Sequence, residues 1–224
     1  MAFMERLAEP ELMDAPEQVE AYVQADFSLA HNQLIDAFVA KFPSYRPEQI
    51  LDLGCGAADV TLRFARLFAQ ADLLGLDAGK NMLLQAKSAI SAEGYENRMS
   101  LVQAHLPRCV LRAHQFDAVV SNSLLHHLND PMDLWSAISH SAASGAVVAV
   151  MDLMRPDSED DLNGLLRRYV ADAPPILKED FEHSLRAAYR IEEVVAQLSL
   201  AGLDLSVEAI SDRHLLIIGR VDAC

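Results

Sequence analysis

A short apolar segment runs directly into two closely spaced glycines, and this junction limits the possible fold more than any other part of the chain. Residues 50–68 read ILDLGCGAADVTLRFARLF, so that a strand-like run leads through Gly54-Cys55-Gly56 into a helix-like repeat. Glycine lets the backbone turn sharply and approach a ligand closely. A strand, a glycine turn and a helix in this order are typical of a nucleotide-binding unit in a parallel sheet.

The start of that helix narrows the class of nucleotide. In the dinucleotide fingerprint G-x-G-x-x-G the third glycine would fall at position 59, which is aspartate in this chain. The pyrophosphate of NAD or FAD would lie at the N-terminus of the helix, where the Asp59 carboxylate would repel it. The sequence therefore disfavours NAD-dependent oxidoreduction and favours a nucleotide that presents no phosphates.

Strand-like and helix-like segments alternate through the middle of the chain. Helical spacing follows the first strand, because Val60, Phe64 and Leu67 recur on one face. Apolar strands separated by helices of this length predict a parallel sheet that is covered on both faces. The short apolar runs that we interpret as strands are 50–53, 72–77, 99–104, 116–122 and 145–154.

The two ends of the chain differ from this middle part. Residues 11–42 read as helices, and a charged, helical segment at 157–187 is interrupted by Pro174-Pro175. A last helix stops at Gly202, and two closely spaced strands follow, which must pair as an antiparallel hairpin. The predicted fold is α/β: a Rossmann-like, doubly wound, mostly parallel sheet with a C-terminal antiparallel hairpin. We expect one domain over 1–224, divided into an N-terminal helical cap (1–45), a cofactor-binding core (46–153), a helical lid (154–190) and a closing helix and hairpin (191–224).

Charge, hydropathy and cysteine content argue against nucleic acid, a membrane and a metal ion as partners of this protein. The formal net charge of -15 disfavours nucleic acid, because an acidic surface repels the phosphate backbone. The longest apolar run, 145–151, is too short to span a bilayer, so we expect a cytoplasmic protein without membrane insertion. Cys55, Cys109 and Cys224 fit neither a disulfide framework nor a zinc spacing, and the sequence predicts no metal site.

Three segments carry a resemblance to a known family: LDLGCGAADVT, LLGLDAGKNML and FDAVVSNSLLHHLNDP, in this order. With the expected sheet and hairpin they resemble the class I S-adenosylmethionine-dependent methyltransferases over roughly residues 45–220. Ala58 takes the place of the third glycine in the usual G-x-G-x-G turn of that family. The resemblance implies S-adenosyl-L-methionine as cofactor and S-adenosyl-L-homocysteine as product. A cofactor with a sulfonium and an ammonium group tolerates the carboxylates of Asp52 and Asp59.

The resemblance also implies which residues hold the cofactor. Asp77 ends the second strand about 20 residues after the glycine turn, where an acidic residue accepts hydrogen bonds from the ribose in this architecture. Capping of the next helix is the alternative for Asp77, and plain core packing is the alternative for Met82 over the adenine. The implied cofactor-binding residues are Asp52, Gly54, Gly56, Asp59, Asp77, Ala78, Met82, Ala104, His105 and Asn122.

The motif after the fourth strand indicates the class of acceptor. The chain has SNSLLHH where methyltransferases of exocyclic amines carry an N-P-P-Y-like sequence, and Cys109 follows Arg108 rather than the proline used in cytosine C5 methylation. The segment resembles small-molecule methyltransferases, which act on oxygen, nitrogen or carbon. A non-catalytic protein that binds S-adenosylmethionine or regulates a partner is the alternative function. The sequence does not indicate the oligomeric state.

His126 is the predicted catalytic base, because an acceptor that must lose a proton needs a base near the reaction centre. His127 is a weaker candidate, and packing against the sheet is the alternative for both. The acceptor pocket should come from the cap and the lid. The predicted substrate residues are Tyr22, Phe27, Arg155, Tyr169 and Tyr189, for each of which ordinary helix packing is the alternative.

Overall fold

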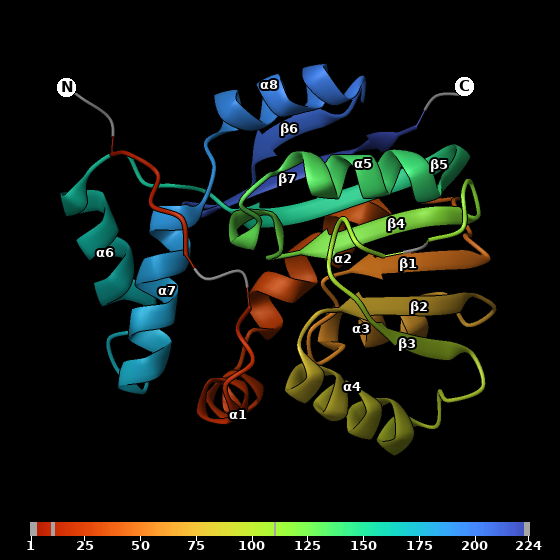
Figure 1. Ribbon diagram of the computed structural model, residues 1–224, viewed down its shortest axis with the longest axis horizontal. Helices are drawn as coiled ribbons and strands as arrows, with labels where there is room; N and C mark the ends of the chain where they lie inside the picture. Colours follow the sequence, from red (N-terminus) through yellow and green to blue (C-terminus); the bar gives the residue numbers. More distant parts are fainter. Residues whose placement is uncertain (1–3, 10–11, 110, 222–224) are drawn as a thin grey trace.

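A single seven-stranded sheet forms the centre of the molecule (Figure 1). The computed structural model describes residues 4–9, 12–109 and 111–221. Its strand order is β3-β2-β1-β4-β5-β7-β6. The strands are β1 (Gln49–Leu53), β2 (Asp72–Asp77), β3 (Met99–Gln103), β4 (Phe116–Asn122), β5 (Ala142–Leu153), β6 (Ser206–Ala209) and β7 (His214–Arg220).

Strand direction agrees with the sequence pattern. The strands β3, β2, β1, β4 and β5 pair in parallel, and β7 runs antiparallel to both β5 and β6. The predicted mostly parallel sheet with a closing antiparallel hairpin is therefore confirmed. The strand β5 begins at Ala142, earlier than position 145, because α5 ends directly before it at Ser141.

Helices cover both faces of this sheet (Figure 1). The side chains of β1 show why, since Ile50 packs into the core shared with α2, α3 and α4 whereas Leu51 packs into the core shared with α5 and α8. Side chains alternate between the two faces of a strand, so a fully apolar strand needs a helical layer on each face. These helices are α2 (Ser28–Lys41), α3 (Asp59–Leu67), α4 (Lys80–Glu93), α5 (Met132–Ser141) and α8 (Ile191–Ala201).

The remaining helices lie beyond the carboxyl ends of the parallel strands, where Figure 1 shows α1 between α7 and α4. They are α1 (Pro16–Gln24), the short 3₁₀ helix η1 (Leu125–His127), α6 (Glu159–Tyr169) and α7 (Pro175–Ala187). The helix α7 begins at Pro175, because proline fits the first turn of a helix, where its missing N–H is not needed. Gln18 Nε2 of α1 donates to Asp180 Oδ1 of α7 at 2.9 Å. The division into cap, core, lid and closing segment stays a prediction.

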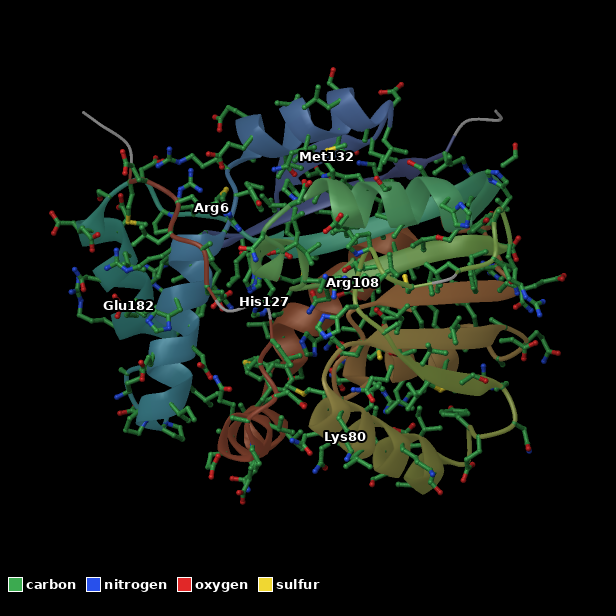
Figure 2. The ribbon with its side chains drawn as sticks, viewed as in Figure 1. Arg6, Lys80, Arg108, His127, Met132 and Glu182 are labelled. Carbon is green, nitrogen blue, oxygen red and sulfur yellow. The ribbon has the colours of Figure 1, made fainter. Side chains whose placement is uncertain are left out.

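The N-terminal segment 4–9 crosses from α7 to η1, and Figure 2 shows Arg6 on it. The guanidinium of Arg6 donates to the carbonyl oxygens of His126 and Leu128, each at 3.1 Å, and to that of Ala187 at 2.5 Å. One side chain thus ties this segment to two separate elements. In the described part of the chain, none of the helices has the length and apolarity that crossing a membrane requires.

Candidate cofactor and acceptor site

A cavity of about 870 Å³ opens at the carboxyl ends of the strands. This is the edge at which open parallel sheets bind their ligands. Its walls come from α1 and the start of α2, the glycine turn, the ends of β2 and β4, η1 and the lid helices. The sequence-predicted residues that line it are Tyr22, Phe27, Gly54, Gly56, Asp77, Ala78, Met82, Ala104, His105, Asn122, His126 and Tyr169.

The glycine turn contributes open space to this cavity. Gly54 and Gly56 both have positive φ, +74° and +51°. A Cβ atom on Gly54 would lie 2.9 Å from the Cβ of Leu124, so this glycine is required by packing within the protein. A Cβ atom on Gly56 would meet nothing within 4 Å and would point into free volume. Ala58 also has positive φ, 68°, which explains why a glycine is the usual residue at this position.

Asp77 joins the glycine turn to the start of the next helix. Its carboxylate accepts hydrogen bonds from the backbone N–H of Gly56 at 2.8 Å and of Gly79 at 2.7 Å. Each carboxylate oxygen has a second lone pair, so Asp77 retains capacity for further donors. Burial raises the pKa of this carboxyl, and the two backbone hydrogen bonds oppose the rise.

A residue that the sequence did not single out caps α4. Asp14 Oδ1 accepts hydrogen bonds from the backbone N–H of Asn81 at 2.7 Å and of Met82 at 3.1 Å. Those N–H groups are unsatisfied within the helix itself, so Asp14 takes the place of an N-cap side chain. Capping of the first turn of α4 therefore comes from the segment before α1, while Asp77 accepts the N–H of Gly79 directly before the helix.

Asp52 lies outside the cavity lining, on the α3 side of the sheet. It is 1% exposed, and one carboxylate oxygen accepts from the Thr61 hydroxyl at 2.6 Å. Its other oxygen, Oδ1, is buried without a hydrogen-bond partner in the described part of the chain. Burial, with a smaller effect of Asp77, raises the pKa of Asp52 to about 7.

Asp59 also lies outside the lining, at the start of α3. Its carboxylate pairs with the His31 ring and with Arg63, whose Nε lies 2.9 Å away. Although burial raises the pKa of Asp59, these hydrogen bonds lower it to about 2. A fixed negative charge therefore remains at the N-terminus of α3, which is the place a pyrophosphate would need.

Asn122, at the end of β4, presents an unsatisfied acceptor at the cavity. Its Oδ1 is buried without a hydrogen-bond partner among the described residues, while its Nδ2 donates to Ser123 Oγ at 3.3 Å. A buried acceptor without a donor is costly, so such atoms point to a ligand or water that donates to them.

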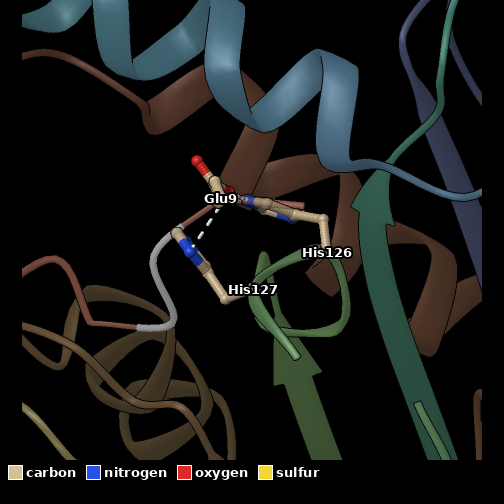
Figure 3. A group of neighbouring side chains, drawn as sticks. All are labelled: Glu9, His126 and His127. Atoms are coloured by element: carbon tan, nitrogen blue, oxygen red, sulfur yellow. Dashed lines mark ion pairs between the residues drawn. The ribbon is translucent and has the colours of Figure 1, made fainter. Parts of the chain in front are cut away.

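The two histidines after β4 meet a carboxylate from the N-terminal segment (Figure 3). His126 is 2% exposed, and its Nδ1 lies 2.5 Å from Asp152 Oδ1. Its Nε2 lies 3.5 Å from Glu9 Oε1, and His127 Nδ1 lies 3.2 Å from the same oxygen. Glu9 and Asp152 were missed by sequence reasoning, since neither belongs to a recognisable motif.

This arrangement sets a condition on the predicted base. Although burial lowers the pKa of His126, the carboxylates of Asp152 and Glu9 outweigh it and raise the pKa above the usual value. A base must be unprotonated, so His126 can accept an acceptor proton at Nε2 only when that atom has no proton shared with Glu9. The catalytic role of His126 stays a prediction.

Two predicted substrate residues do not reach the cavity. Arg155 is 4% exposed and its guanidinium donates to the carbonyl oxygen of Ala188 at 2.7 Å and to Glu193 at 2.6 Å. Tyr189 packs into the core beside α5 and α8, with the Arg6 guanidinium 4.2 Å from its ring centroid. Both residues hold the lid and the N-terminal segment against the sheet, because each is buried among structural partners.

The lid side of the cavity combines apolar and aromatic surface with one arginine. Tyr169 packs edge-on against Phe181, and its hydroxyl donates to Asp212 at 2.8 Å. The Arg213 guanidinium lies 3.4 Å from the Tyr169 ring centroid. Among the described lining residues, Arg213 is the one lysine or arginine. The lid side also presents the carboxylate of Asp180, so its wall is mainly apolar with a few charged groups.

Comparisons with known proteins agree with this geometry. Residues 50–145 match the model of a family described as methyltransferase domain. The chain is 27% identical over 141 residues to a trans-aconitate 2-methyltransferase of Afipia carboxidovorans, covering 63% of this chain and 51% of that protein. It is 26% identical over 134 residues to a 2-phytyl-1,4-naphtoquinone methyltransferase of Trichormus variabilis, covering 59% of this chain and 58% of that one. The matches thus span little more than half the length of these curated relatives.

Solved structures share the fold. A crystal structure described as a SAM-dependent methyltransferase from Aquifex aeolicus superposes with a TM-score of 0.70 at 15% sequence identity, covering 92% of this chain and 98% of the other. At this identity the likeness shows the fold alone. The fold is that of the class I S-adenosylmethionine-dependent methyltransferases, which confirms the resemblance seen in the sequence.

Proposed function

Because residues 50–145 carry the methyltransferase domain and the whole sheet has the class I fold, we propose that this protein transfers a methyl group from S-adenosylmethionine to a small organic acceptor. The observation that carries the proposal is a single cavity that joins the glycine turn, Asp77 and Asn122 at one end to the histidines and the apolar lid at the other. A cofactor and an acceptor need one shared space, since the methyl group passes directly between them.

The donors and acceptors of the cavity fit this cofactor. Gly56 leaves open volume where the backbone must approach the methionine portion. Asp77 has lone pairs for the ribose hydroxyls, and the buried Oδ1 of Asn122 suits the α-ammonium, which only donates. Ala78, Met82, Ala104 and His105 line the same cavity and would enclose the adenine.

Alignment is the main catalytic task. When bound, S-adenosylmethionine supplies an electrophilic methyl group on a positively charged sulfur. Asp77 and Asn122 would hold the ribose and the amino-acid portion of the cofactor, while Tyr22, Phe27 and Tyr169, which line the same cavity, would exclude water. Holding both reactants in line removes most of the entropic barrier of a bimolecular step. His126 would take the proton of an acceptor that must lose one.

A small acceptor suits the charge of the molecule better than a nucleic acid does. The net charge of -15 disfavours a polyanion such as nucleic acid. The curated relatives are described as methyltransferases of trans-aconitate and of a naphthoquinone, both small molecules. We propose the cytoplasm as its compartment, where the free Cys55 and Cys109 thiols stay reduced.

A non-catalytic S-adenosylmethionine-binding protein is the second candidate, since the cofactor end of the cavity would look the same. The extension of the cavity to the lid residues Tyr169 and Phe181 favours the enzyme, because a sensor needs no room for an acceptor. Isothermal titration with S-adenosylhomocysteine tests both candidates, with NADH as the comparison ligand. We expect micromolar binding of S-adenosylhomocysteine and none of NADH. No binding of S-adenosylhomocysteine would overturn both, and tight binding of NADH would restore the oxidoreductase.

A screen of small acceptors then separates the two candidates. S-adenosylhomocysteine release is measured with phenols, hydroxyquinones, carboxylic acids and amines. Release that depends on one acceptor class establishes the enzyme. Binding of the cofactor without release on any class would favour the sensor.

A further inference from the structure

Glu9, His126 and His127 form a cluster at the histidine end of the cavity, and the proposed reaction gives no role to Glu9 or His127. One ligand-capable atom from each residue lies within 4.8 Å of the other two. Figure 3 shows that Glu9 approaches from the N-terminal segment, while both histidines come from η1. His126 and His127 also line the cavity. The cluster therefore joins a distant segment to the reaction space.

Hydrogen bonds to backbone carbonyl oxygens hold the N-terminal segment against η1 and α7, on either side of this cluster. The Arg6 guanidinium donates to the carbonyl oxygens of His126 and Leu128, and the Leu7 N–H donates to the Arg186 carbonyl at 3.0 Å. Glu9 is only two residues further along the chain. The approach of its carboxylate to the histidines is thus fixed by the fold and not by a flexible side chain alone.

Asp152 orients the most buried member of the cluster. One oxygen of Asp152 lies 2.5 Å from His126 Nδ1, and the other accepts the Leu125 N–H at 2.8 Å. This leaves His126 Nε2 directed at Glu9, 3.5 Å from Oε1. A carboxylate behind a histidine, with the other ring nitrogen facing forward, is the usual support of a metal-binding imidazole.

Burial and charge favour a cation between these groups. The Glu9 side chain is 8% exposed, and the Ser184 hydroxyl donates to its Oε2 at 3.3 Å. Its Oε1 makes no hydrogen bond within the described part of the chain and faces the two imidazoles at 3.2 and 3.5 Å. Glu9 and Asp152 together carry two negative charges when ionised, which a divalent ion would balance. Buried charges are stable only when they are paired, so a bound cation would stabilise this cluster.

We propose that Glu9, His126 and His127 bind one divalent transition-metal ion of the zinc type. Two imidazoles and one carboxylate are a ligand set of zinc and related ions, and three protein ligands leave a coordination position open. That position would be reached from the cavity, since both histidines line it. In the proposed methyl transfer, on which this part rests, the ion would hold an acceptor through a hydroxyl or carboxylate oxygen.

The ion would also help an acceptor hydroxyl to react. Coordination lowers the pKa of a bound hydroxyl, so its proton passes to solvent before the transfer. The oxygen lone pair then forms the new bond to the methyl carbon, and the carbon–sulfur bond breaks with its electron pair going to sulfur. His126 acts as a ligand in this case, and no separate base is needed.

Zinc and cobalt titrations of the chelator-treated protein test the site. We expect one Zn²⁺ bound per chain in the micromolar range or tighter, and visible absorption bands when Co²⁺ replaces it. Acetohydroxamate, a small oxygen chelator, should shift the cobalt bands if a position is open. No stoichiometric binding of either ion would overturn the proposal, and unshifted bands would overturn the open position.

Paired variants separate this site from adventitious histidine binding. Glu9→Gln and His127→Ala should each weaken Zn²⁺ binding about tenfold or more, and Asp152→Asn about 10- to 100-fold. Glu17→Gln, a carboxylate elsewhere on the wall, and His183→Ala, a histidine of α7 close to Glu9, should leave it unchanged. Equal affinity in the cluster variants and these controls would overturn the proposal. Circular dichroism of each variant verifies folding, and the conservative Glu9→Gln keeps the test valid if another variant unfolds.

S-adenosylhomocysteine titration of the same metal-free sample keeps this proposal distinct from the proposed function. Zinc binding without S-adenosylhomocysteine binding would support the metal site and remove the methyltransferase. Binding of S-adenosylhomocysteine without zinc binding would support the methyltransferase and remove the metal site.

Discussion

At the scale of single residues, Gly56 and Gly94 share a positive φ but have different surroundings. Both have positive φ, and a Cβ atom on either would meet nothing within 4 Å. Gly56 faces the cavity, whereas Gly94 ends α4 as its C-cap. Each substitution to alanine should therefore cost a similar backbone strain, of about 1 kcal/mol.

Ligand binding should separate this matched pair. We predict that Gly56→Ala weakens S-adenosylhomocysteine binding about tenfold or more, because its methyl group fills space that the cofactor needs, at about 1.4 kcal/mol per tenfold. Gly94→Ala should lower stability but leave the affinity unchanged. Calorimetric titration and urea unfolding of both variants provide the measurement. Equal affinities in the two variants would show that the cofactor does not approach this turn.

Asp52 makes stability depend on pH. Its folded-state pKa is raised to about 7 by burial, above the usual value of 3.8. The folded protein then binds a proton more tightly than the unfolded chain, so the free energy of unfolding falls as pH rises from about 4 to about 7. The asparagine of the Asp52→Asn variant resembles the protonated acid and does not titrate. The free energy of unfolding of this variant therefore lacks the pH dependence that Asp52 causes. We predict that the variant gains at least about 1 kcal/mol relative to the wild type between these pH values. If the free energies of unfolding of the wild type and the variant, measured with urea, change in parallel with pH, the raised pKa of Asp52 is contradicted.

At the scale of elements, the segment before α1 fixes the start of α4. Asp14 accepts two backbone N–H groups of α4, and Ser158 accepts one of α6 through its hydroxyl at 3.2 Å. We predict that Asp14→Ala and Ser158→Ala each lower the free energy of unfolding by about 0.5–2 kcal/mol. Only Asp14→Ala should also weaken S-adenosylhomocysteine binding, because α4 and α1 both border the cavity. If Ser158→Ala weakens binding equally, the effect comes from general destabilisation.

The elements themselves could be predicted from sequence to a large extent. Apolar runs and helical spacing identified the strands and most helices, because the buried positions of each element are apolar residues at a regular spacing in the sequence. The 3₁₀ helix η1 was not predicted, because three residues carry no periodicity. Arg155 and Tyr189 were expected in the pocket because they lie in the segment 154–190 that the resemblance identified as a lid. Their actual partners, Glu193 and Arg6, come from other elements and leave no local signal.

At the scale of the whole molecule, the fold assembles a site that no single segment contains. The sequence identified the glycine turn and Asp77, since these belong to a local motif. Glu9 could not be found in this way, because its proximity to His126 depends on the path of the N-terminal segment across α7. The same holds for Asp152, which reaches His126 from the next strand of the sheet. Contacts between distant segments, and not composition, decide the acceptor end of the cavity.

A crystal structure of the complex with S-adenosylhomocysteine tests most directly the claim that this cavity holds cofactor and acceptor side by side. We predict ribose hydroxyls on the Asp77 carboxylate and the ligand's ammonium on Asn122 Oδ1. The sulfur should face His126 and His127 across the remaining free volume. A ligand bound outside this cavity, or a sulfur turned away from the histidines, would contradict the proposed function.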